Sequence, residues 1–441
     1  MMDHDKAFFK IEEETMSEDY RKMWADLGLD LDKHDRLLEA LGAMYKDLYM
    51  RQENRPAGMQ YFDFVISEAH GLRIRELLDG KKKGKVFGTF CVYVPEEVIL
   101  ALDSICVGLC AGTAFSIPDA EAVLPSSLCP LIKSAFGFKV GKLCPYFEAS
   151  DVLVGETTCD GKKKVWEILK KLQNTFVMQV PSCKTGDSRS LWRNEVKRFA
   201  AMAEELTGKK LTPENLAAGI ETADKKRLAL QRLNALRFHA PAVISGKDAL
   251  LVNQIAFYDD PVRLTARVNA LCDELDERVR RNEAVFPAET VRLLVSGCPL
   301  ALPNWKLHHV VETSGAVIVC EESCVGTRYF TDRVEPGGAK TADALLDAIA
   351  DRYLMINCAC FTPNEGRADQ IVELHEKSGA VGVIHNSLVF CHPYIVESVL
   401  VREKLQQKKI PVLTLESDYG DGDMDQIRTR VKAFIEVITK Q

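Results

Sequence analysis

Residues 86–105 read VFGTFCVYVPEEVILALDSI and determine how the first half of the chain folds. The apolar run around Cys91 is typical of a buried strand, Pro95 marks a turn, and the stretch from Glu96 predicts a helix. A strand followed by a turn and a helix is the unit from which parallel α/β sheets are built. This stretch therefore predicts the first of a series of such units.

The same unit recurs later in the first half of the chain and again in the second half. After residue 105 come a run ending at Cys110, the helix-like CPLIKSAFGF, the strand-like segment before Cys159, a helix starting near Lys162, and TFVMQVPS. From about residue 288 the order begins again with TVRLLVSGCPLALP, NWKLHHVVETSG, AVIVCEESC, GAVGVIHNSLVFCHPY and IPVLTLESDYGDG. We therefore expect an α/β fold with two Rossmann-like parallel-sheet domains, related by an internal duplication and facing each other across a cleft.

Two helical stretches accompany these units. The segment before residue 84 mixes polar and apolar residues at helical spacing, and the segment after residue 187 is dense in Arg, Lys, Glu, Ala and Leu. Within the second stretch, Thr212 is a predicted N-cap and Pro213 a predicted first helical residue. The predicted organisation is an N-terminal helical segment (1–83), a first α/β domain (84–187), a helical connector (188–286) and a second α/β domain (287–441).

Composition narrows the function classes. The 441 residues are 46% hydrophobic and 27% charged, which is ordinary for a globular protein. A net charge of −7 argues against nucleic acid as the main partner. No apolar run is long enough for a membrane helix, and the polar, acidic N-terminus lacks the apolar core of a secretory signal. We expect a cytoplasmic protein whose fourteen cysteines stay reduced.

Six of these cysteines form two matching triplets. The last interval of each triplet is nearly equal, and each Cys stands beside a turn signal such as LCAG, LCP or FCHPY. In open α/β sheets, ligands gather at the carboxyl ends of the strands. The pattern predicts metal ligands brought together between the two domains and indicates an iron–sulfur redox protein. The predicted ligands are Cys110, Cys129, Cys159, Cys324, Cys360 and Cys391.

Alternatives remain for the cysteines. Structural zinc usually shows closely spaced cysteine pairs, and none of the six makes one with another. Cys358 stands too close to Cys360 for both to bind one tetrahedral ion, whereas Cys144, in KLCPYF, is a candidate substitute ligand. A buried thiol also packs as a small hydrophobe, which is the expectation for Cys106, Cys272 and Cys320.

Candidate proton relays lie near the predicted ligands. Glu156 and Glu322 shortly precede Cys159 and Cys324, and His309 lies in the second half. Capping or solvated carboxylates explain the two Glu equally well, and a structural role explains His309 and the other candidates, His308, His385 and His392. The basic runs KKKGK (81–85) and DGKKK (160–164) are candidates for binding phosphate groups such as those of a coenzyme A thioester, or are solvated helix starts.

Three stretches carry a family resemblance. LPSSLCPLIKSAFGF (124–138), CPYFEASDVLVGETTCDGKKK (144–164) and HNSLVFCHPY (385–394) resemble the 2-hydroxyacyl-CoA dehydratase and benzoyl-CoA reductase family, over roughly residues 60–441. The resemblance implies one 4Fe–4S cluster on Cys129, Cys159 and Cys391. It also implies a separate ATP-hydrolysing iron–sulfur activator, itself a homodimer. The chain has no P-loop, so ATP would be bound by that partner.

The cysteines in GLCAGT, EESCVGTRYF and NCACFTPN depart from the dehydratase pattern. They resemble the double-cubane branch of the family, in which two 4Fe–4S units joined by a sulfide form an 8Fe–9S cluster on six cysteines. That branch forms homodimers and reduces small molecules with ATP-driven electrons, so the resemblance adds Cys110, Cys324 and Cys360 to the ligand set. The leading hypothesis is such a reductase. The rivals are a 2-hydroxyacyl-CoA dehydratase subunit with a single 4Fe–4S cluster, a lyase, and a non-enzymatic scaffold or electron carrier.

Overall fold

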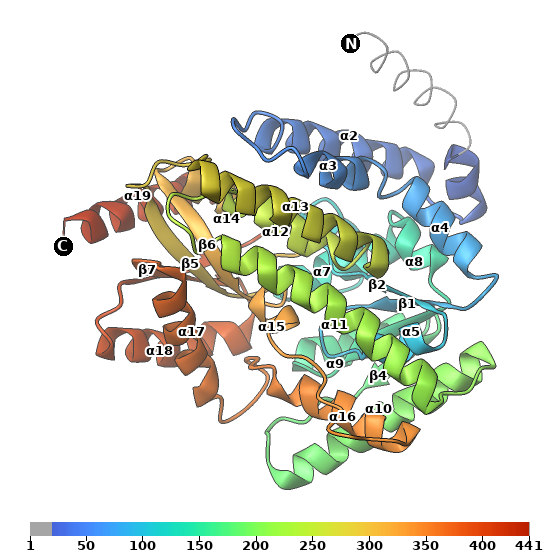
Figure 1. Ribbon diagram of the computed structural model, residues 1–441. Coiled ribbons are helices and arrows are strands. Elements are labelled where there is room, and N and C mark those ends of the chain that lie inside the picture. Colours follow the sequence, from blue (N-terminus) through green and yellow to red (C-terminus); the bar gives the residue numbers. More distant parts are fainter. Residues whose placement is uncertain (1–19, 441) are drawn as a thin grey trace.

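The computed structural model describes residues 20–440, and these form two parallel sheets joined and covered by helices. Figure 1 shows the two sheets with the long connecting helices running across both units. Residues 1–19 of the predicted N-terminal segment, and Gln441, lie outside the described residues. Within the described range, no helix is both long enough and apolar enough to cross a membrane.

The first unit follows helices α2, α3 and α4. Its strands alternate with helices, as the run at 86–105 predicts. The elements up to the end of this unit are α2 (Leu31–Leu48), α3 (Met59–Ser67), α4 (Leu72–Gly80), β1 (Val86–Thr89), α5 (Glu96–Ala101), β2 (Ile105–Gly108), α6 (Ile117–Glu121), α7 (Pro130–Val140), α8 (Pro145–Ala149), β3 (Val152–Glu156), α9 (Asp160–Leu169) and β4 (Thr175–Met178).

Helices alone connect the two sheets, and the second unit then repeats the alternation. The connecting helices are α10 (Gly186–Thr207), α11 (Pro213–Leu236), α12 (Gly246–Ile255) and α13 (Pro261–Arg281). The second unit contains β5 (Val291–Gly297), α14 (Lys306–Glu312), β6 (Ala316–Glu322), α15 (Thr327–Phe330), α16 (Ala342–Met355), α17 (Glu365–Ser378), β7 (Gly382–Leu388), α18 (His392–Gln407), β8 (Val412–Ser417) and α19 (Met424–Thr439).

The two sheets have the same topology. The strand order is β2-β1-β3-β4 in the first and β6-β5-β7-β8 in the second, and every pairing is parallel. Strands such as β3 and β6 are buried along their whole length, as expected for parallel strands covered on both faces. The fold class is therefore confirmed, and the shared strand order agrees with the predicted duplication.

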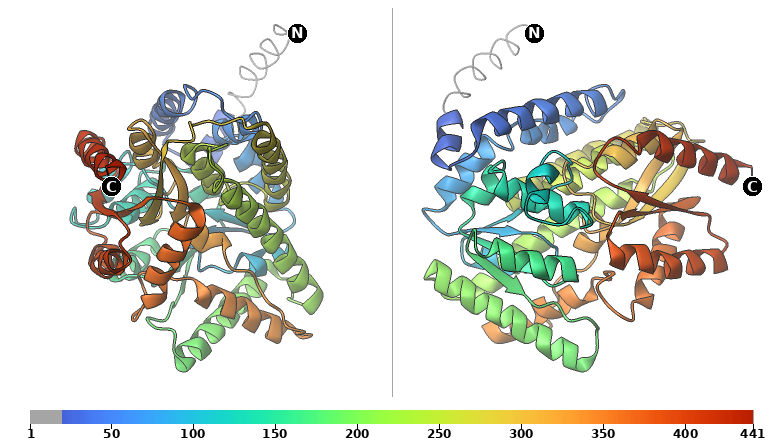
Figure 2. Two further views of the ribbon diagram at one scale, coloured as in Figure 1. Left: turned by 60° about the vertical axis from the view of Figure 1, so that its left-hand side comes forward. Right: turned by 180° about the vertical axis from the view of Figure 1, so that it is seen from behind.

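The connector ties the two units together. Helix α11 contacts α5 of the first unit and α15 and α16 of the second, and the largest core cluster contains residues of both units and of the connector. The start of α11 is as predicted: the Thr212 side chain accepts a hydrogen bond from the Asn215 N–H, and Pro213 is the first helical residue. Figure 2 shows α10 and α11 against the two units from two further directions. The domain boundaries after residues 83, 187 and 286 stay predictions.

Candidate metal and active site

The carboxyl ends of strands from both sheets border one cavity of about 1340 Å³. Its wall is formed by the loops after β1, β2 and β3 of the first unit and after β5, β6 and β7 of the second, together with the loop between α16 and α17. Ordinary small-molecule pockets have volumes of about 300–1,000 Å³. The cavity therefore has room for more than a small substrate.

All six predicted ligand cysteines line this cavity. Three come from the first unit and three from the second, as the two triplets predict. They are Cys110, Cys129, Cys159, Cys324, Cys360 and Cys391. Cys144, the candidate substitute, is the N-cap residue of α8 and is not among the residues that line the cavity. The fold therefore brings the two triplets together and leaves Cys144 outside.

Three of these cysteines begin helices. Cys129 is the N-cap residue of α7, Cys159 of α9 and Cys391 of α18. The Cys159 sulfur accepts a hydrogen bond from the Lys162 N–H at 3.5 Å. The unpaired N–H groups and the dipole of a helix N-terminus stabilise negative charge there, which includes the charge of a thiolate. This effect is outweighed in the metal-free protein: the contact with Cys391 together with burial raises the pKa of Cys129, and burial raises the pKa of Cys159.

Three further thiols, which are not in the ligand set predicted from the sequence, also line the cavity. Cys91 follows β1, Cys298 follows β5, and Cys358 is two residues before Cys360. Cys298 is 3% exposed, and its sulfur accepts a hydrogen bond from the Leu388 N–H at 3.3 Å. The sequence did contain a signal for two of them: Cys91 and Cys298 stand at matching positions after the first strand of each unit, which indicates that both lie at the same edge of their sheets.

Contacts between sulfurs divide the thiols into groups. Cys391 is hydrogen-bonded to Cys129 and to Cys298 on one side of the cavity. Cys358 and Cys360 are hydrogen-bonded to each other, and this contact lowers the pKa of Cys358 and raises the pKa of Cys360. The first contact joins the first unit to the second, so the cysteines of both units approach each other directly.

Burial keeps several of these thiols protonated in the absence of a cation. It raises the pKa of Cys110 to about 12, and the Cys110 sulfur donates to the Phe90 carbonyl oxygen at 2.7 Å. A metal that binds such a thiol must displace its proton. Among residues 20–440, no group of three or more His, Cys, Asp or Glu side chains is arranged to hold a metal ion. The thiols are spread over the cavity wall.

The predicted relay Glu156 is buried at the end of β3 and forms an ion pair with Lys162. Burial raises the pKa of Glu156, and the charge of Lys162 opposes this shift. The Trp166 ring N–H donates to the Glu156 carbonyl oxygen at 2.8 Å. Lys162 lines the cavity while Glu156 does not, so the pair lies directly behind the wall.

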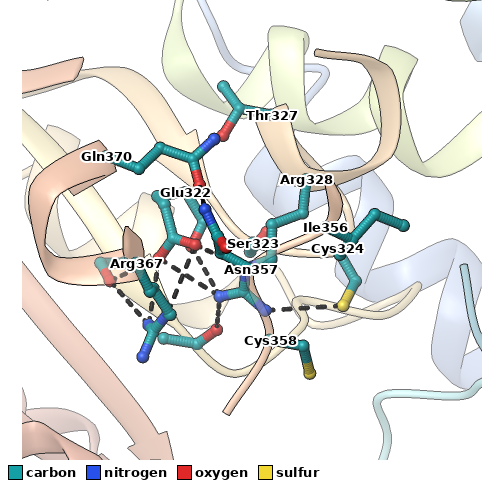
Figure 3. Close-up of polar contacts among 12 residues, drawn as sticks. Glu322, Ser323, Cys324, Thr327, Arg328, Ile356, Asn357, Cys358, Arg367 and Gln370 are labelled. Carbon is teal, nitrogen blue, oxygen red and sulfur yellow. Dashed lines mark hydrogen bonds and ion pairs between the residues drawn. The ribbon is translucent and has the colours of Figure 1, made fainter. Parts of the chain in front are cut away.

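The predicted relay Glu322 lies in a buried network behind the second triplet (Figure 3). Its carboxylate accepts hydrogen bonds from Arg328 and Arg367, and all three side chains are fully buried. Although burial alone raises the pKa of Glu322, the two guanidinium groups lower it to about 2. The carboxylate therefore anchors two arginines, and its relay role stays a prediction.

The histidines lie at different places. His309 is in α14 and is not among the lining residues, so its relay role also stays a prediction without support from its position. His308 Nε2 lies 2.9 Å from the Glu321 carboxylate, and His385 is buried near Ser296. His392, the first residue of α18, is the one histidine of the described residues that lines the cavity.

Carboxylates pair with five of the seven lysines in the two basic runs. In DGKKK, Lys162 pairs with Glu156, Lys163 with Asp160 and Lys164 with Glu167. In KKKGK, Lys81 pairs with Asp151 and Lys82 with Asp79. These pairs leave less positive charge for phosphate groups than the sequence alone indicates.

A family model described as "2-hydroxyglutaryl-CoA dehydratase, D-component" matches residues 91–438 of this chain. The protein belongs to this family. The matched stretch contains every strand of the two sheets except β1, which ends at Thr89, and it contains all nine thiols of the cavity. The resemblance seen in the sequence is therefore confirmed at the level of the family.

Relatives of known name cover most of the chain. "Putative dehydratase subunit YjiM" of Escherichia coli (strain K12) is 35% identical over 377 residues, which is 85% of this chain and 97% of the relative. The (R)-phenyllactyl-CoA dehydratase beta subunit of Clostridium sporogenes is 22% identical, covering 80% and 92%. One of the subunits of benzoyl-CoA reductase from Thauera aromatica is 21% identical, covering 82% and 93%. This member of the D-component family is thus similar to subunits of both dehydratases and a reductase.

Proposed function

We propose that this protein is the cluster-bearing component of an ATP-driven, low-potential reductase of small molecules. Its cavity would hold an 8Fe–9S double-cubane cluster on the six predicted ligands. The observation that carries the proposal is that these six thiols, three from each unit, line one cavity. Thiolates are the usual protein ligands of iron–sulfur clusters. Because the thiols are spread over the wall, a group with several metal atoms reaches more of them than a single ion does.

The chain's own residues suit such a group. Helix N-termini behind Cys129, Cys159 and Cys391 stabilise negative charge on those sulfurs. The Glu156–Lys162 pair and the Glu322 network lie behind the wall and fix its backbone. When bound, the cluster supplies low-potential electrons to a substrate. This chain contains no nucleotide-binding motif, so the proposal includes a separate ATP-hydrolysing iron–sulfur activator as electron donor.

The substrate we propose is a small molecule without a coenzyme A carrier. Where α17 and α18 form the wall, four carboxylates line the cavity: Glu365, Asp369, Glu397 and Glu403. Lys404 pairs with Asp369 and Arg367 with Glu397, so among residues 20–440 Glu365 and Glu403 are the two of these carboxylates without an ion pair. Such a wall repels the phosphates of a coenzyme A thioester. The active assembly proposed is a homodimer of this chain that meets the activator transiently.

A second candidate is a subunit of a 2-hydroxyacyl-CoA dehydratase with one 4Fe–4S cluster. The relatives named as dehydratase beta subunits favour it, and so does the grouping of its three ligands. Cys129, Cys159 and Cys391 all begin helices, and Cys129 contacts Cys391. This candidate leaves Cys110, Cys324 and Cys360 without a metal role.

Counting iron and acid-labile sulfide on anaerobically prepared protein separates the two. The reductase proposal expects about eight irons and nine sulfides per chain, and the dehydratase candidate expects about four of each. The double variant Cys324→Ser/Cys360→Ser sharpens the test, since it removes iron only under the first proposal. Cys183→Ser is the matched control, because Cys183 is not among the lining residues and is hydrogen-bonded to Ser188. About four irons in the unaltered protein would refute the double cluster.

A further inference from the structure

Arg328 in α15 brings a permanent positive charge to one side of the cavity wall. Its side chain is fully buried. One of its nitrogens, Nη1, lies 3.6 Å from the Cys324 sulfur and also donates to the Tyr394 hydroxyl. Figure 3 shows the guanidinium between Glu322 and Cys324. Arg328 therefore links the buried carboxylate behind the wall to a predicted ligand in the wall.

The position of the guanidinium is fixed by four further contacts. Its Nε donates to the Glu322 carboxylate at 2.5 Å, and Nη2 reaches the same carboxylate at 3.3 Å. Nη2 also donates to the carbonyl oxygens of Gly297 at 2.6 Å and Glu322 at 2.9 Å. A planar guanidinium held at this many points has little freedom to turn away. The contact with Cys324 is thus built into the fold.

Tyr394 extends the contact to a second thiol. Its hydroxyl oxygen accepts from Arg328, which leaves its own proton to donate, and the Cys358 sulfur lies 3.6 Å away. Arg328 and Arg367 also lie over the Tyr394 ring, at 5.1 and 5.0 Å from its centre. One arginine and one tyrosine therefore direct hydrogen-bond donors at Cys324 and Cys358.

The opposite side of the cavity has a different set of partners. Cys159 accepts a main-chain N–H, Cys110 donates its own proton to a carbonyl oxygen, and Cys129 contacts another thiol. The nearby cation Lys162 is bound to Glu156 as its partner. Glu322 is shared between Arg328 and Arg367, and Arg367 also pairs with Glu397, so Arg328 keeps a donor for the Cys324 sulfur within a charge-balanced network. The two sides of the wall therefore differ in the side-chain donors that reach the sulfurs, which come from Arg328 and Tyr394 on the second side.

We propose that Arg328 is a positioning residue that, with Tyr394, makes the Cys324–Cys358 side of the metal centre easier to reduce than the Cys129–Cys391 side. The inference rests on the proposed function, because it requires Cys324 to be a cluster ligand. Hydrogen bonds to sulfur and nearby positive charge stabilise the more negative, reduced form of an iron–sulfur centre and so raise its potential. Electrons arriving from the activator would settle on this side first.

The test is anaerobic redox titration followed by EPR on the iron-loaded protein. Arg328→Met removes both the positive charge and the N–H donors. Arg328→Lys keeps the charge but loses the branched set of guanidinium donors. Tyr394→Phe removes the hydroxyl group that lies near Cys358. We expect Arg328→Met to shift the oxidised-to-reduced ratio of one transition about tenfold towards the oxidised form at fixed potential. For a one-electron couple this corresponds to about 59 mV. The potential of the other transition should not change. In Arg328→Lys, the potential of the affected transition should lie between those of the unaltered protein and Arg328→Met.

Arg367→Met is the matched control. Arg367 is equally buried, bonds the same Glu322 carboxylate and lies over the same Tyr394 ring, but it has no thiol among its hydrogen-bond partners. A shift of equal size in Arg367→Met would overturn the inference, and so would unchanged potentials in Arg328→Met with full iron content. If Arg328→Met does not fold, Arg328→Lys decides, because it keeps the charge and must lower the same transition by a smaller amount through the lost contact with the Cys324 sulfur.

Iron content keeps this inference separate from the function it rests on. About four irons in the unaltered protein would overturn the double-cluster proposal, and the inference with it. About eight irons with potentials that do not respond to Arg328 or Tyr394 would overturn the inference alone. An equal loss of iron in Arg328→Met and Arg328→Lys would count against tuning and in favour of a purely structural role.

Discussion

Cys129 and Cys391 share a hydrogen bond across the cavity, although one begins α7 in the first unit and the other begins α18 in the second. The contact exists because the carboxyl ends of both sheets border one cavity: Cys391 follows β7, and Cys129 lies in the segment between β2 and β3. The duplicated fold thus provides two matching sets of thiols at one site. The contact between the two sets of thiols therefore depends on how the two units are positioned relative to each other.

Replacing Cys391 is expected to remove metal without unfolding the protein. Cys391→Ser takes away one ligand and the partner of Cys129, so we expect iron content to fall to about half of the unaltered value or below. Iron and sulfide analysis with circular dichroism measures both effects. Cys298→Ser should retain its iron, because the Cys298 sulfur already accepts the Leu388 N–H and has a structural role. Full iron content in Cys391→Ser would remove Cys391 from the ligand set.

The Glu156–Lys162 pair is expected to be essential for stability behind the cavity wall. Lys162→Met leaves the fully buried Glu156 carboxylate without its cation, and breaking a buried pair in this way costs about 3–5 kcal/mol. We expect the thermal midpoint of the anaerobic protein to fall by several degrees. The double variant Glu156→Gln/Lys162→Met should recover much of the loss.

The surface pair Lys164–Glu167 provides the comparison, with side chains that are 77% and 67% exposed. Lys164→Met should change the midpoint little, since exposed pairs contribute at most about 1 kcal/mol. If Lys162→Met were as stable as Lys164→Met, the buried pair would have no structural role. Glu156 would then be free to act as the predicted proton relay.

The sequence predicted the parts of the site that depend on local order. Turn signals after apolar strands placed Cys110, Cys159, Cys324 and Cys391 at the carboxyl ends of strands, where parallel sheets gather their ligands. The matching order of the two halves predicted that both triplets would meet, and the lining of the cavity bears this out. Periodicity also identified the connector helices, with Thr212 as N-cap residue.

The remaining features depend on contacts between distant segments. Tyr394 and Cys358 are 36 residues apart, and no pattern within either stretch indicates that they meet. The Glu156 and Glu322 carboxylates were candidates for relays, but their buried cationic partners were not foreseen. Two of those partners have a local signal, since Lys162 stands in the motif that follows Glu156, and Arg328 is four residues after Cys324.

Gly297, at the end of β5, is expected to tolerate no side chain. Its φ is +123°, and an added Cβ would lie 2.0 Å from the Asn386 carbonyl oxygen in the neighbouring β7. Gly297→Ala would therefore push β5 from β7 and displace the Gly297 carbonyl oxygen, to which Arg328 donates. We expect loss of more than about 3 kcal/mol of stability, or failure to accumulate as soluble protein.

Gly186→Ala is the control for this change. Gly186 begins α10, and an added Cβ there meets nothing within 4 Å. Since Ala has the higher helix propensity, this variant should be as stable as the unaltered protein or slightly more so. Equal thermal midpoints for the two glycine variants would show that β5 and β7 can separate without cost.

Stability is expected to fall between pH 5 and pH 8 because of Glu312. Burial raises the pKa of this carboxyl to about 7, against the opposing charge of Lys247, and its oxygen accepts the Gly246 N–H at 2.6 Å. A folded-state pKa above the ordinary value near 4.5 means that folding favours the protonated form. Its contribution to the free energy of unfolding is complete below about pH 4.5 and is lost as the pH rises through 7, by about 3 kcal/mol in total.

In Glu312→Gln this loss is absent. The urea midpoint of the variant minus that of the unaltered protein should therefore increase from pH 5 to pH 8. Glu289→Gln, at an exposed carboxyl, controls for net charge. A difference that stays constant over this range would mean that Glu312 is ionised in the folded protein throughout.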